Sequence, residues 1–290
     1  TIGTGYTDTA GNTGGAGTSA NYVIDGVDPT VSSITMADTA LKAGDTSALT
    51  IVFSEAVAAF ANEDVTVQNG AISTLSTSDS ITWTATFTPT ADVEDAVNVI
   101  SVATSYTDTA GNDGGAGTSA NYAVETLAPS VSSITMADTT LIEGETSLLT
   151  IVFSEAVAAF ANADVTAPNG AISTLASSDS ITWTATYTPT ADTEDDSNTI
   201  SVGTSYTDTA GNAGGAGTSA NYAVDTLAPS VATLSLSDTT LLVGDTATLT
   251  IVFSEAVAGF ANEDVTIASA AITTLATSDD ITWTATLTPT

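Results

Sequence analysis

The sequence predicts an all-β protein made of tandem β-sandwiches with a period of 100 residues. The string IVFSEAVA begins at residues 51, 151 and 251, and proline stands at positions 29, 129 and 229. Hydrophobic residues make up 42% of the chain and are mostly Val, Ile, Ala and Leu, accompanied by abundant Thr. This mixture favours strands. A unit of about 100 residues is too long for a solenoid turn and has the usual size of an autonomous sandwich domain.

The period divides the chain into four parts. Residues 29–128 and 129–228 are expected to be complete sandwiches, which we call repeat 1 and repeat 2. Residues 229–290 correspond to the N-terminal part of a further unit, which we call repeat 3. Residues 1–28 correspond to the C-terminal part of a unit and are called the N-terminal segment.

Turn signals within repeat 1 separate about seven expected strands. Asn69-Gly70 is a strong hairpin signal, and Ile81, Trp83, Ala85 and Phe87 alternate with threonines. The expected strands are 31–36, 47–53, 64–68, 71–75, 81–88, 97–106 and 119–124. No segment has a helical period. This strand count is typical of an immunoglobulin-like sandwich, with Trp83 and Tyr106 in its core, and we expect the units to follow one another as an extended rod.

The charge of the chain excludes several classes of partner. The formal net charge is -33, from 34 acidic residues and one basic residue, Lys42. Binding of nucleic acid needs Lys and Arg to neutralise phosphates, and binding to an anionic membrane surface needs the same residues. No apolar run reaches the length of about 18 residues that spans a bilayer. We therefore expect no nucleic acid partner and no membrane insertion in this segment.

The acidic residues are expected to converge at the entrance of each repeat. Because successive strands run up and down, Glu55 and Asp108 should lie at the same pole of repeat 1, close to the linker that carries Asp25 and Asp28. The acids of the loop at 92–95 would face the equivalent linker of the next unit. Carboxylates that converge without cations must protonate, separate or bind a cation. Calcium fits, because it takes six to eight oxygen ligands. The absence of His and Cys disfavours zinc and copper, and magnesium prefers a smaller shell with retained waters.

The glycine-rich loop at 105–118 is the centre of this hypothesis. Asp108 offers a carboxylate, Gly111 permits a tight turn, and Asn112 either hydrogen-bonds locally or offers an oxygen. Glu125 begins the link to the next repeat. The alternative is that these acids are solvated surface charges beside a flexible turn. For Asp38, Asp79 and Asp164 we expect solvated acids or turn caps.

At these residues the sequence resembles the bacterial immunoglobulin-like repeats of giant surface adhesins, including RTX-type and biofilm-associated adhesins. The shared pattern is FSEAV, a DVT strand, a WTAT[FYL]TP strand, an acidic ED loop, a YTDxAGN loop and an LAP linker, and it covers the whole chain. The resemblance implies a secreted extender at the bacterial cell surface, stiffened by calcium at its domain junctions. The ligands that it implies are Asp8, Asp25, Glu55, Asp108, Glu125, Glu155, Asp208, Asp225 and Glu255. Asp28, Asn112 and Asn212 complete the candidate set. The first linker departs from the pattern, with DGVDP in place of an acid followed by TLAP.

No enzyme is expected. Without His or Cys the usual nucleophilic triads are unavailable, and acids that recur at every junction are better explained by structure than by one glycosidase site. The expected partners are neighbouring repeats of the same chain. One alternative is a module that binds glycans or proteins through exposed loops. Another is an extracellular fibre in which identical chains complete one another's sandwiches. Because residues equivalent to 91–100 would be missing from such a completed unit, a longer chain is favoured over the fibre.

Overall fold

The computed structural model describes residues 1–290, and its regular secondary structure consists almost entirely of β-strands. Helical structure is limited to three single 3-10 turns, η1 (Asn62–Asp64), η2 (Asn162–Asp164) and η3 (Asn262–Asp264). The predicted all-β class is therefore confirmed. The chain forms two compact units. The first contains Thr1–Ser130 together with Glu155–Phe160 and Thr204–Gly215, and the second contains the remaining residues.

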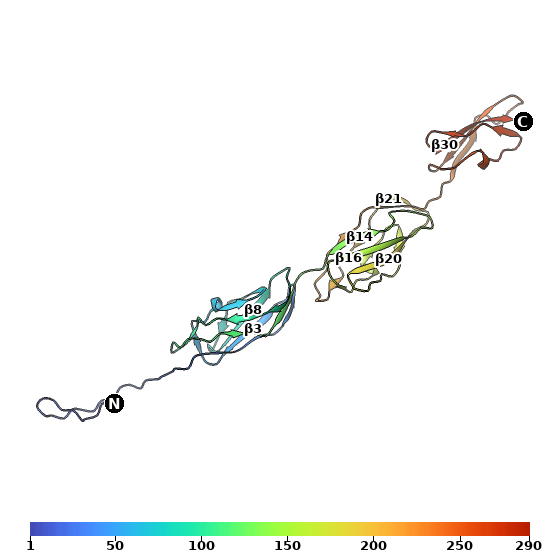
Figure 1. Cartoon of the computed structure of the whole chain (residues 1–290). Coiled ribbons are helices and arrows are strands. Elements are labelled where there is room, and N and C mark those ends of the chain that lie inside the picture. Colours follow the sequence, from blue (N-terminus) through green and yellow to red (C-terminus); the bar gives the residue numbers. More distant parts are fainter. The chain divides into compact units, whose positions relative to one another are not determined.

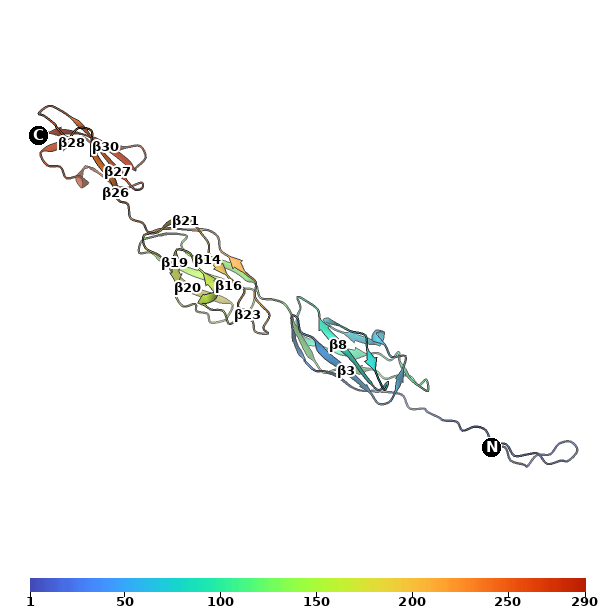
Figure 2. The same cartoon turned by 180° about the vertical axis from the view of Figure 1, so that it is seen from behind.

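One layer of repeat 1 is an antiparallel sheet in which β3 and β8 lie side by side (Figures 1 and 2). Its strands, in spatial order, are β1 (Val31–Met36), β3 (Ser47–Phe53), β8 (Thr82–Pro89) and β6 (Gly70–Ile72), and β7 (Ser76–Thr77) also pairs with β8. Burial alternates along β3 and along the central part of β8. This alternation reflects the period of two in the sequence, which turns one face of a sheet toward the core.

The opposite layer of repeat 1 consists of three shorter ladders. The strands are β5 (Val65–Val67), β10 (Ile100–Val102) and β12 (Gly117–Thr118) in one ladder, β2 (Ala40–Lys42), β13 (Tyr122–Glu125) and β9 (Glu94–Asn98) in the second, and β4 (Val57–Ala58) and β11 (Thr107–Asp108) in the third. Residues from both layers form one buried core, with Leu49 and Ile51 of β3 packed in the same cluster as Ile100 and Tyr122.

The expected core aromatics differ in burial. Tyr106 is fully buried, and its hydroxyl group donates a hydrogen bond to the carbonyl oxygen of Gly115 at 2.7 Å. Trp83 is only half-buried and packs edge-to-face on Phe60, with ring centroids 5.2 Å apart. The indole therefore closes one end of the core rather than filling its centre.

Several expected strand boundaries were wrong. The expected strand at 97–106 is divided into β9 and β10, and β9 reaches back into the expected acidic loop. The division coincides with buried Asn98, whose side-chain amide donates to the carbonyl oxygens of Asp95 and Tyr122. The expected strand at 119–124 begins only at Tyr122, and η1 takes the first residue of the expected strand at 64–68.

Repeat 2 supplies three sheets to the second unit, and β14, β16 and β20 lie side by side (Figure 1). The strands are β14 (Val131–Met136), β16 (Ser147–Phe153), β20 (Thr182–Pro189) and β19 (Gly170–Ile172); β15 (Thr140–Ile142), β25 (Tyr222–Asp225) and β21 (Glu194–Asn198); and β18 (Val165–Thr166), β22 (Ser201–Val202) and β24 (Gly217–Thr218). The remaining pair, β17 (Val157–Ala158) with β23 (Thr207–Asp208), belongs to the first unit.

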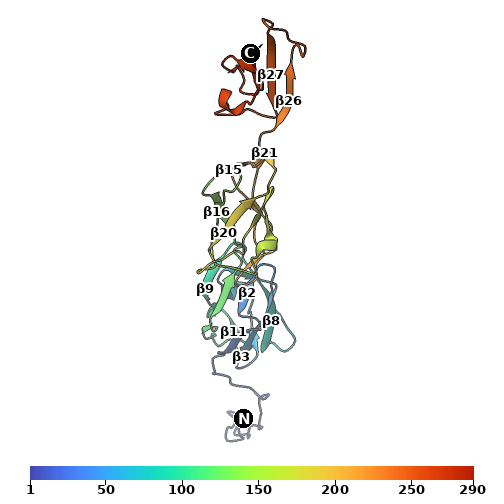
Figure 3. The same ribbon diagram turned by 90° about the vertical axis from the view of Figure 1, so that its right-hand side faces the viewer.

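Repeat 3 contributes one sheet to the second unit, in which β26 and β27 are neighbours (Figure 3). Its strands are β26 (Val231–Leu236), β27 (Ala247–Phe253), β30 (Thr282–Pro289), β28 (Ala270–Ile272) and β29 (Ala276–Thr277). Residues 229–290 contain no counterpart of β21 to β25.

Candidate metal centre

Two groups of three carboxylates come together within the first unit. The Asp25 cluster consists of Asp25, Glu55 and Asp108, and the Glu125 cluster consists of Glu125, Glu155 and Asp208. In each cluster one oxygen from each carboxylate lies within 4.8 Å of the others. The residues of each cluster are far apart in sequence. One lies where a linker begins, one lies in the bend of an FSEAV motif, and one ends β11 or β23.

Strand pairing explains why these residues meet. β17 and β23 pair antiparallel with Val157 opposite Asp208. Glu155 lies two residues before Val157, so this pairing holds its side chain at the same end of the ladder as Asp208. Glu125 is the last residue of β13, where the chain enters the linker. β4 and β11 repeat this arrangement with Val57 opposite Asp108.

The carboxylate of Asp208 organises its own loop. Its Oδ1 accepts hydrogen bonds from the backbone N–H groups of Gly211 at 2.6 Å and Asn212 at 2.9 Å. Gly211 has a φ of 97°, a conformation that residues with a Cβ adopt only with strain. Gly111 has the same φ of 97°, so the tight turn predicted there is confirmed. Asp208 itself is 1% exposed.

Asn212 connects Asp208 to the linker and to repeat 1. Its Nδ2 donates to Asp208 Oδ2 at 2.7 Å, to Glu125 Oε2 at 2.8 Å and to the Glu125 carbonyl oxygen at 3.0 Å. Its Oδ1 accepts a hydrogen bond from the backbone N–H of Ala43 at 2.8 Å. The amide therefore uses both of its polar atoms to orient the cluster.

Glu125 has the most unusual environment of the cluster. Its Oε1 is buried without any hydrogen-bond partner, whereas its Oε2 accepts the bond from Asn212. Burial, together with the neighbouring carboxylates of Asp208 and Glu155, raises the pKa of Glu125 to about 7. A carboxylate with an unpaired buried oxygen is unfavourable unless a proton or a cation joins it.

The pKa values of the other two acids of the Glu125 cluster are shifted in opposite directions. Burial and the charges of Asp208 and Glu94 raise the pKa of Glu155. Burial also acts to raise the pKa of Asp208. The hydrogen bonds from Asn212 and Gly211 outweigh this effect, so the pKa of Asp208 is lowered. Glu94 lies in β9, within the acidic segment 92–95 that the sequence predicted as a loop facing the next linker. The effect of its charge on the pKa of Glu155 agrees with that expectation.

The Asp25 cluster is more open. Asp25 is exposed, Glu55 is half-buried and Asp108 is 2% exposed. Asn112 donates to Asp108 Oδ2 at 2.7 Å but reaches only the carbonyl oxygen of Asp25, at 3.4 Å. Burial and the charges of Asp25 and Asp108 raise the pKa of Glu55.

Four of the acidic candidate ligands do not belong to either cluster. Asp8 is exposed, and its Oδ1 and Oδ2 accept hydrogen bonds from the backbone and side chain of Asn12. Asp28 and Asp225 are exposed as well. Glu255 has a buried Oε1 without a partner, as Glu125 does, but no group of three acids forms around it. A metal-binding role for any candidate stays a prediction.

The geometry of the Glu125 cluster fits a hard divalent cation. All of its donors are carboxylate oxygens, which calcium prefers. The orphaned Oε1 of Glu125 leaves a lone pair directed at no protein donor. Lys42, the only basic residue, lies at the edge of the same loop, where a Cβ on Gly211 would be 3.1 Å from its Nζ. One ammonium group does not balance three carboxylates.

The sequence analysis missed the residues that fix the linker. Thr126 is 4% exposed; its hydroxyl donates to the Thr90 carbonyl oxygen at 2.7 Å and accepts from the Val93 N–H at 3.0 Å. Thr226 makes equivalent bonds in the second unit. The recurrence of threonine after the acid in two linkers, with Gly26 in the first, was the available signal.

The acids expected outside the clusters cap turns. Asp79 Oδ1 accepts from the backbone N–H groups of Ile81 and Thr82, and Asp38 Oδ1 accepts from that of Ala40. Asp164 Oδ2 accepts from the Ala161 N–H. Such bonds satisfy backbone donors at turns and need no metal.

Comparison with known proteins identifies the family of these repeats. The model of the family described as Bacterial Ig-like domain matches residues 25–124, 125–224 and 225–290. Its boundaries lie four residues before those of our repeats. No curated protein sequence matches the chain. A marsupial T cell receptor structure is 11% identical over 88% of this chain and 92% of that chain, and its TM-score of 0.34 is too low to carry an argument.

The structure contains no helix long and apolar enough to cross a lipid bilayer. Domains of this type are typically structural modules without enzymatic activity, and they are typically extracellular or surface-associated. The family match covers three consecutive repeats and most of the sequence. The chain belongs to the family of bacterial Ig-like domains.

Proposed function

We propose that this chain is a stalk segment of a secreted bacterial surface adhesin, in which calcium ions stiffen the junctions between repeats. The observation that carries the proposal is the buried, unpartnered Oε1 of Glu125 beside the carboxylates of Glu155 and Asp208. An unpaired charge of this kind is costly to bury. A cation bound between these carboxylates would neutralise the buried charge and stabilise the folded state.

The residues of the cluster would link three segments of the first unit. Glu125 ends β13 of repeat 1, whereas in repeat 2 Glu155 lies in a bend and Asp208 ends β23. When bound, calcium would supply positive charge and accept oxygen ligands from all three. Asn212 would hold the side chains of Glu125 and Asp208 in position, because it already hydrogen-bonds both. Linker and loops would then move as one body.

Recurrence supports a structural role over a recognition role. The acid, glycine and asparagine of the loop return at residues 8–12, 108–112 and 208–212, and the glutamate of FSEAV returns at 55, 155 and 255. Recognition of a specific ligand needs one distinctive site, whereas a stalk needs the same junction many times.

Thermal unfolding of the whole chain in a calcium titration tests the proposal. Binding to the folded state alone should stabilise it by RT ln(1 + [L]/Kd), roughly 2.7 kcal/mol at a calcium concentration about a hundred times Kd. We expect the unfolding temperature of the metal-free protein to rise with calcium and to return after chelation. An unfolding temperature that does not respond to calcium would refute the metal-binding role.

Glu155→Gln is the matched test variant. Gln keeps the shape of the side chain and removes one charged ligand, so most of the calcium-dependent stabilisation should disappear. Glu143→Gln removes the same charge from an exposed turn that belongs to neither cluster. This control should retain the calcium response of the wild type. Equal responses of the two variants would show that calcium acts through general screening of charge.

A further inference from the structure

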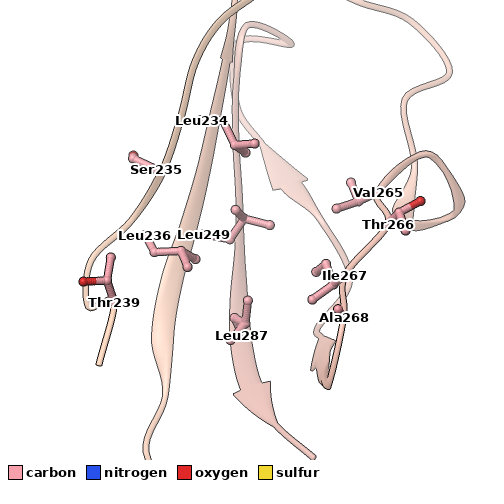
Figure 4. A pocket seen from close by; sticks show the side chains of 10 residues that line it. All are labelled: Leu234, Ser235, Leu236, Thr239, Leu249, Val265, Thr266, Ile267, Ala268 and Leu287. Carbon is pink, nitrogen blue, oxygen red and sulfur yellow. The ribbon is translucent and has the colours of Figure 1, made fainter. Parts of the chain in front are cut away.

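A groove in repeat 3 shows where the charge of the chain does not lie. It has a volume of about 620 Å³ and is lined by ten residues, among them Leu234, Val265 and Leu287 (Figure 4). These residues offer apolar groups and hydroxyl groups but no carboxylate and no ammonium group. The groups that act on a cation at the Glu125 cluster therefore belong to other parts of the chain.

The only basic side chain of the protein stands beside the Glu125 cluster. Lys42 is the last residue of β2, and the parallel pairing of β2 with β13 makes it the Cα partner of Glu125. Its side chain is half-buried. Among 290 residues, the single lysine thus occupies the position opposite the acid that begins the linker.

The ammonium group of Lys42 lies against the loop that carries Asp208. A Cβ built on Gly211 would be 3.1 Å from Lys42 Nζ and 3.7 Å from Lys42 Cδ. The backbone N–H of the same glycine donates to Asp208 Oδ1 at 2.6 Å. Gly211 therefore has the ammonium group beside its Cα and a carboxylate of the cluster on its N–H, so opposite charges face each other across one residue.

The turn that follows Lys42 contacts the same loop. Ala43 donates its backbone N–H to Asn212 Oδ1 at 2.8 Å, and the Nδ2 of this asparagine is bonded to the cluster. Asp45 closes the turn, because its Oδ2 accepts from the Lys42 N–H at 3.1 Å. These bonds fix the backbone of Lys42, so its side chain starts from a defined point next to the cluster.

The fold of the repeat does not require a basic residue at this position. The counterparts of Lys42 are Ile142 and Leu242. Their backbone N–H groups make the same turn bond, to Glu145 Oε2 at 3.1 Å and to Asp245 Oδ2 at 2.9 Å. Because the turn forms without a charge, the ammonium group of Lys42 is free to serve another role.

We propose that Lys42 is a built-in counter-ion of the Glu125 cluster, which steadies the junction in the metal-free chain and weakens the binding of calcium there. The calcium part rests on the proposed function, because it needs a cation at the cluster. Without calcium, the ammonium group attracts the neighbouring carboxylates. When calcium binds, the same charge repels the ion, and the flexible stem of the lysine lets the ammonium group move into solvent.

The consequence is a junction that is partly ordered at every calcium concentration and fills with calcium over a higher range than an all-acidic one. A nearby unit charge changes the binding of a divalent ion measurably even when water screens the two charges. Removal of the ammonium charge should lower the calcium Kd of the cluster about three- to tenfold at low ionic strength.

Calorimetric calcium titrations of the whole chain test this expectation. The signal that disappears in Glu155→Gln belongs to the Glu125 cluster. Lys42→Met keeps the length of the side chain without its charge and should bind calcium more tightly than the wild type. Lys42→Arg keeps the charge and should bind as the wild type does. Unchanged or weaker binding by Lys42→Met would overturn the proposal.

A displaced lysine controls for the net charge of the chain. Lys42→Met with Thr186→Lys restores that charge on an exposed residue of β20, which belongs to the second unit, whereas the cluster belongs to the first. This double variant should bind calcium as tightly as Lys42→Met alone. A return to the wild-type affinity would show that only the net charge matters, which contradicts a counter-ion placed at the cluster.

Ionic strength separates the effect of charge from that of packing. Between about 0.01 M and about 1 M salt the Debye length falls from about 30 Å to about 3 Å. The difference in calcium Kd between Lys42→Met and the wild type should therefore shrink toward none. A difference that stays the same at high salt would mean that the side chain acts through packing.

Amide hydrogen exchange tests the metal-free part of the proposal. The N–H of Ala43 reports on the contact of the turn with the loop, because it is bonded to Asn212. In chelator at low salt, this N–H should exchange faster in Lys42→Met than in the wild type, and Lys42→Arg should keep the wild-type rate. Equal rates in Lys42→Met and the wild type would contradict a role of the charge in the metal-free chain.

A label on the single lysine separates this proposal from the proposed function. Reductive methylation with carbon-13 keeps the charge of the amine, and the signal missing from labelled Lys42→Arg identifies Lys42. This signal should shift when calcium is added to the wild type and stay in place in Glu155→Gln. An unfolding temperature that responds to calcium without a shift of this signal would support the proposed function and overturn the role of Lys42. No calcium response in either measurement would refute the proposed function, and the exchange rate of Ala43 would still decide the metal-free part.

Discussion

Gly114 shows why a glycine-rich run follows the acidic turn. A Cβ built on this residue would lie 2.4 Å from the ring of Tyr106. The ring is fully buried, and its hydroxyl group is held by Gly115, so it has no space into which it could move. The glycine therefore serves packing, and the run is not merely flexible.

Substitution of Gly114 by alanine should be destabilising. Overpacking of a filled core costs about 1–3 kcal/mol, and chemical denaturation of the chain would measure the loss. Gly115→Ala is the matched control, because its Cβ would approach no atom closer than 3.6 Å. Comparable losses for the two variants would show that the ring of Tyr106 is not the cause.

The pKa of Glu125 predicts an unusual pH dependence of the metal-free protein. Because burial raises the pKa of Glu125 from its ordinary value of 4.5 to about 7, the folded state keeps a proton that the unfolded state has lost. Its contribution to stability is complete below pH 4.5 and is lost as the pH rises through 7. In chelator, the unfolding temperature should therefore fall between these values.

Glu125→Gln provides the control for this pH effect. The variant should show a flatter profile in the same window, because Gln does not titrate. Asp108 and Asp208 have a lowered pKa owing to hydrogen bonds from their own loops, and their contributions are lost only in more acidic solution. An unfolding temperature that rises from pH 5 to about 7 in chelator would contradict the assignment.

At the scale of elements, the linker after β13 is held by Thr126 rather than by its acid alone. The buried hydroxyl satisfies the Thr90 carbonyl oxygen and the Val93 N–H. Thr126→Val would leave both groups without this partner, at a cost of about 1–3 kcal/mol. Amide hydrogen exchange at Val93 should accelerate in this variant.

Thr88→Val is the comparison for Thr126→Val. Thr88 is exposed in β8, and valine favours strands, so the stability should change little. Unchanged exchange at Val93 in Thr126→Val would mean that the linker is held by other contacts.

At the scale of the whole molecule, the proposed function predicts that calcium changes the dimensions of the chain. Without a cation, the acids at each junction repel, and salt only screens them. Small-angle scattering at low protein concentration should give a larger and better defined maximum dimension with calcium than with chelator. Glu155→Gln should reduce the difference, whereas Glu143→Gln should preserve it. Identical curves in both conditions would contradict the stiffening.

Local patterns in the sequence were sufficient for the fold class. The period of 100 residues, the alternation at Ile81–Phe87 and the Asn-Gly turn predicted the repeats, and three strands with an error of at most one residue at either end. These features depend on residues close together in the chain, where backbone geometry and side-chain periodicity act directly. The same reasoning placed Glu55 and Asp108 at one pole.

Only the tertiary structure decided how the acids are surrounded. The short pairs β4 with β11 and β17 with β23 lie in segments that the sequence predicted as loops, and they set the separation of the carboxylates. The buried Oε1 of Glu125, the bridge from Asn212 to Ala43 and the break at Asn98 depend on groups that are distant in sequence. Burial and hydrogen bonding between distant segments arise only when the chain packs, so no local pattern contains them.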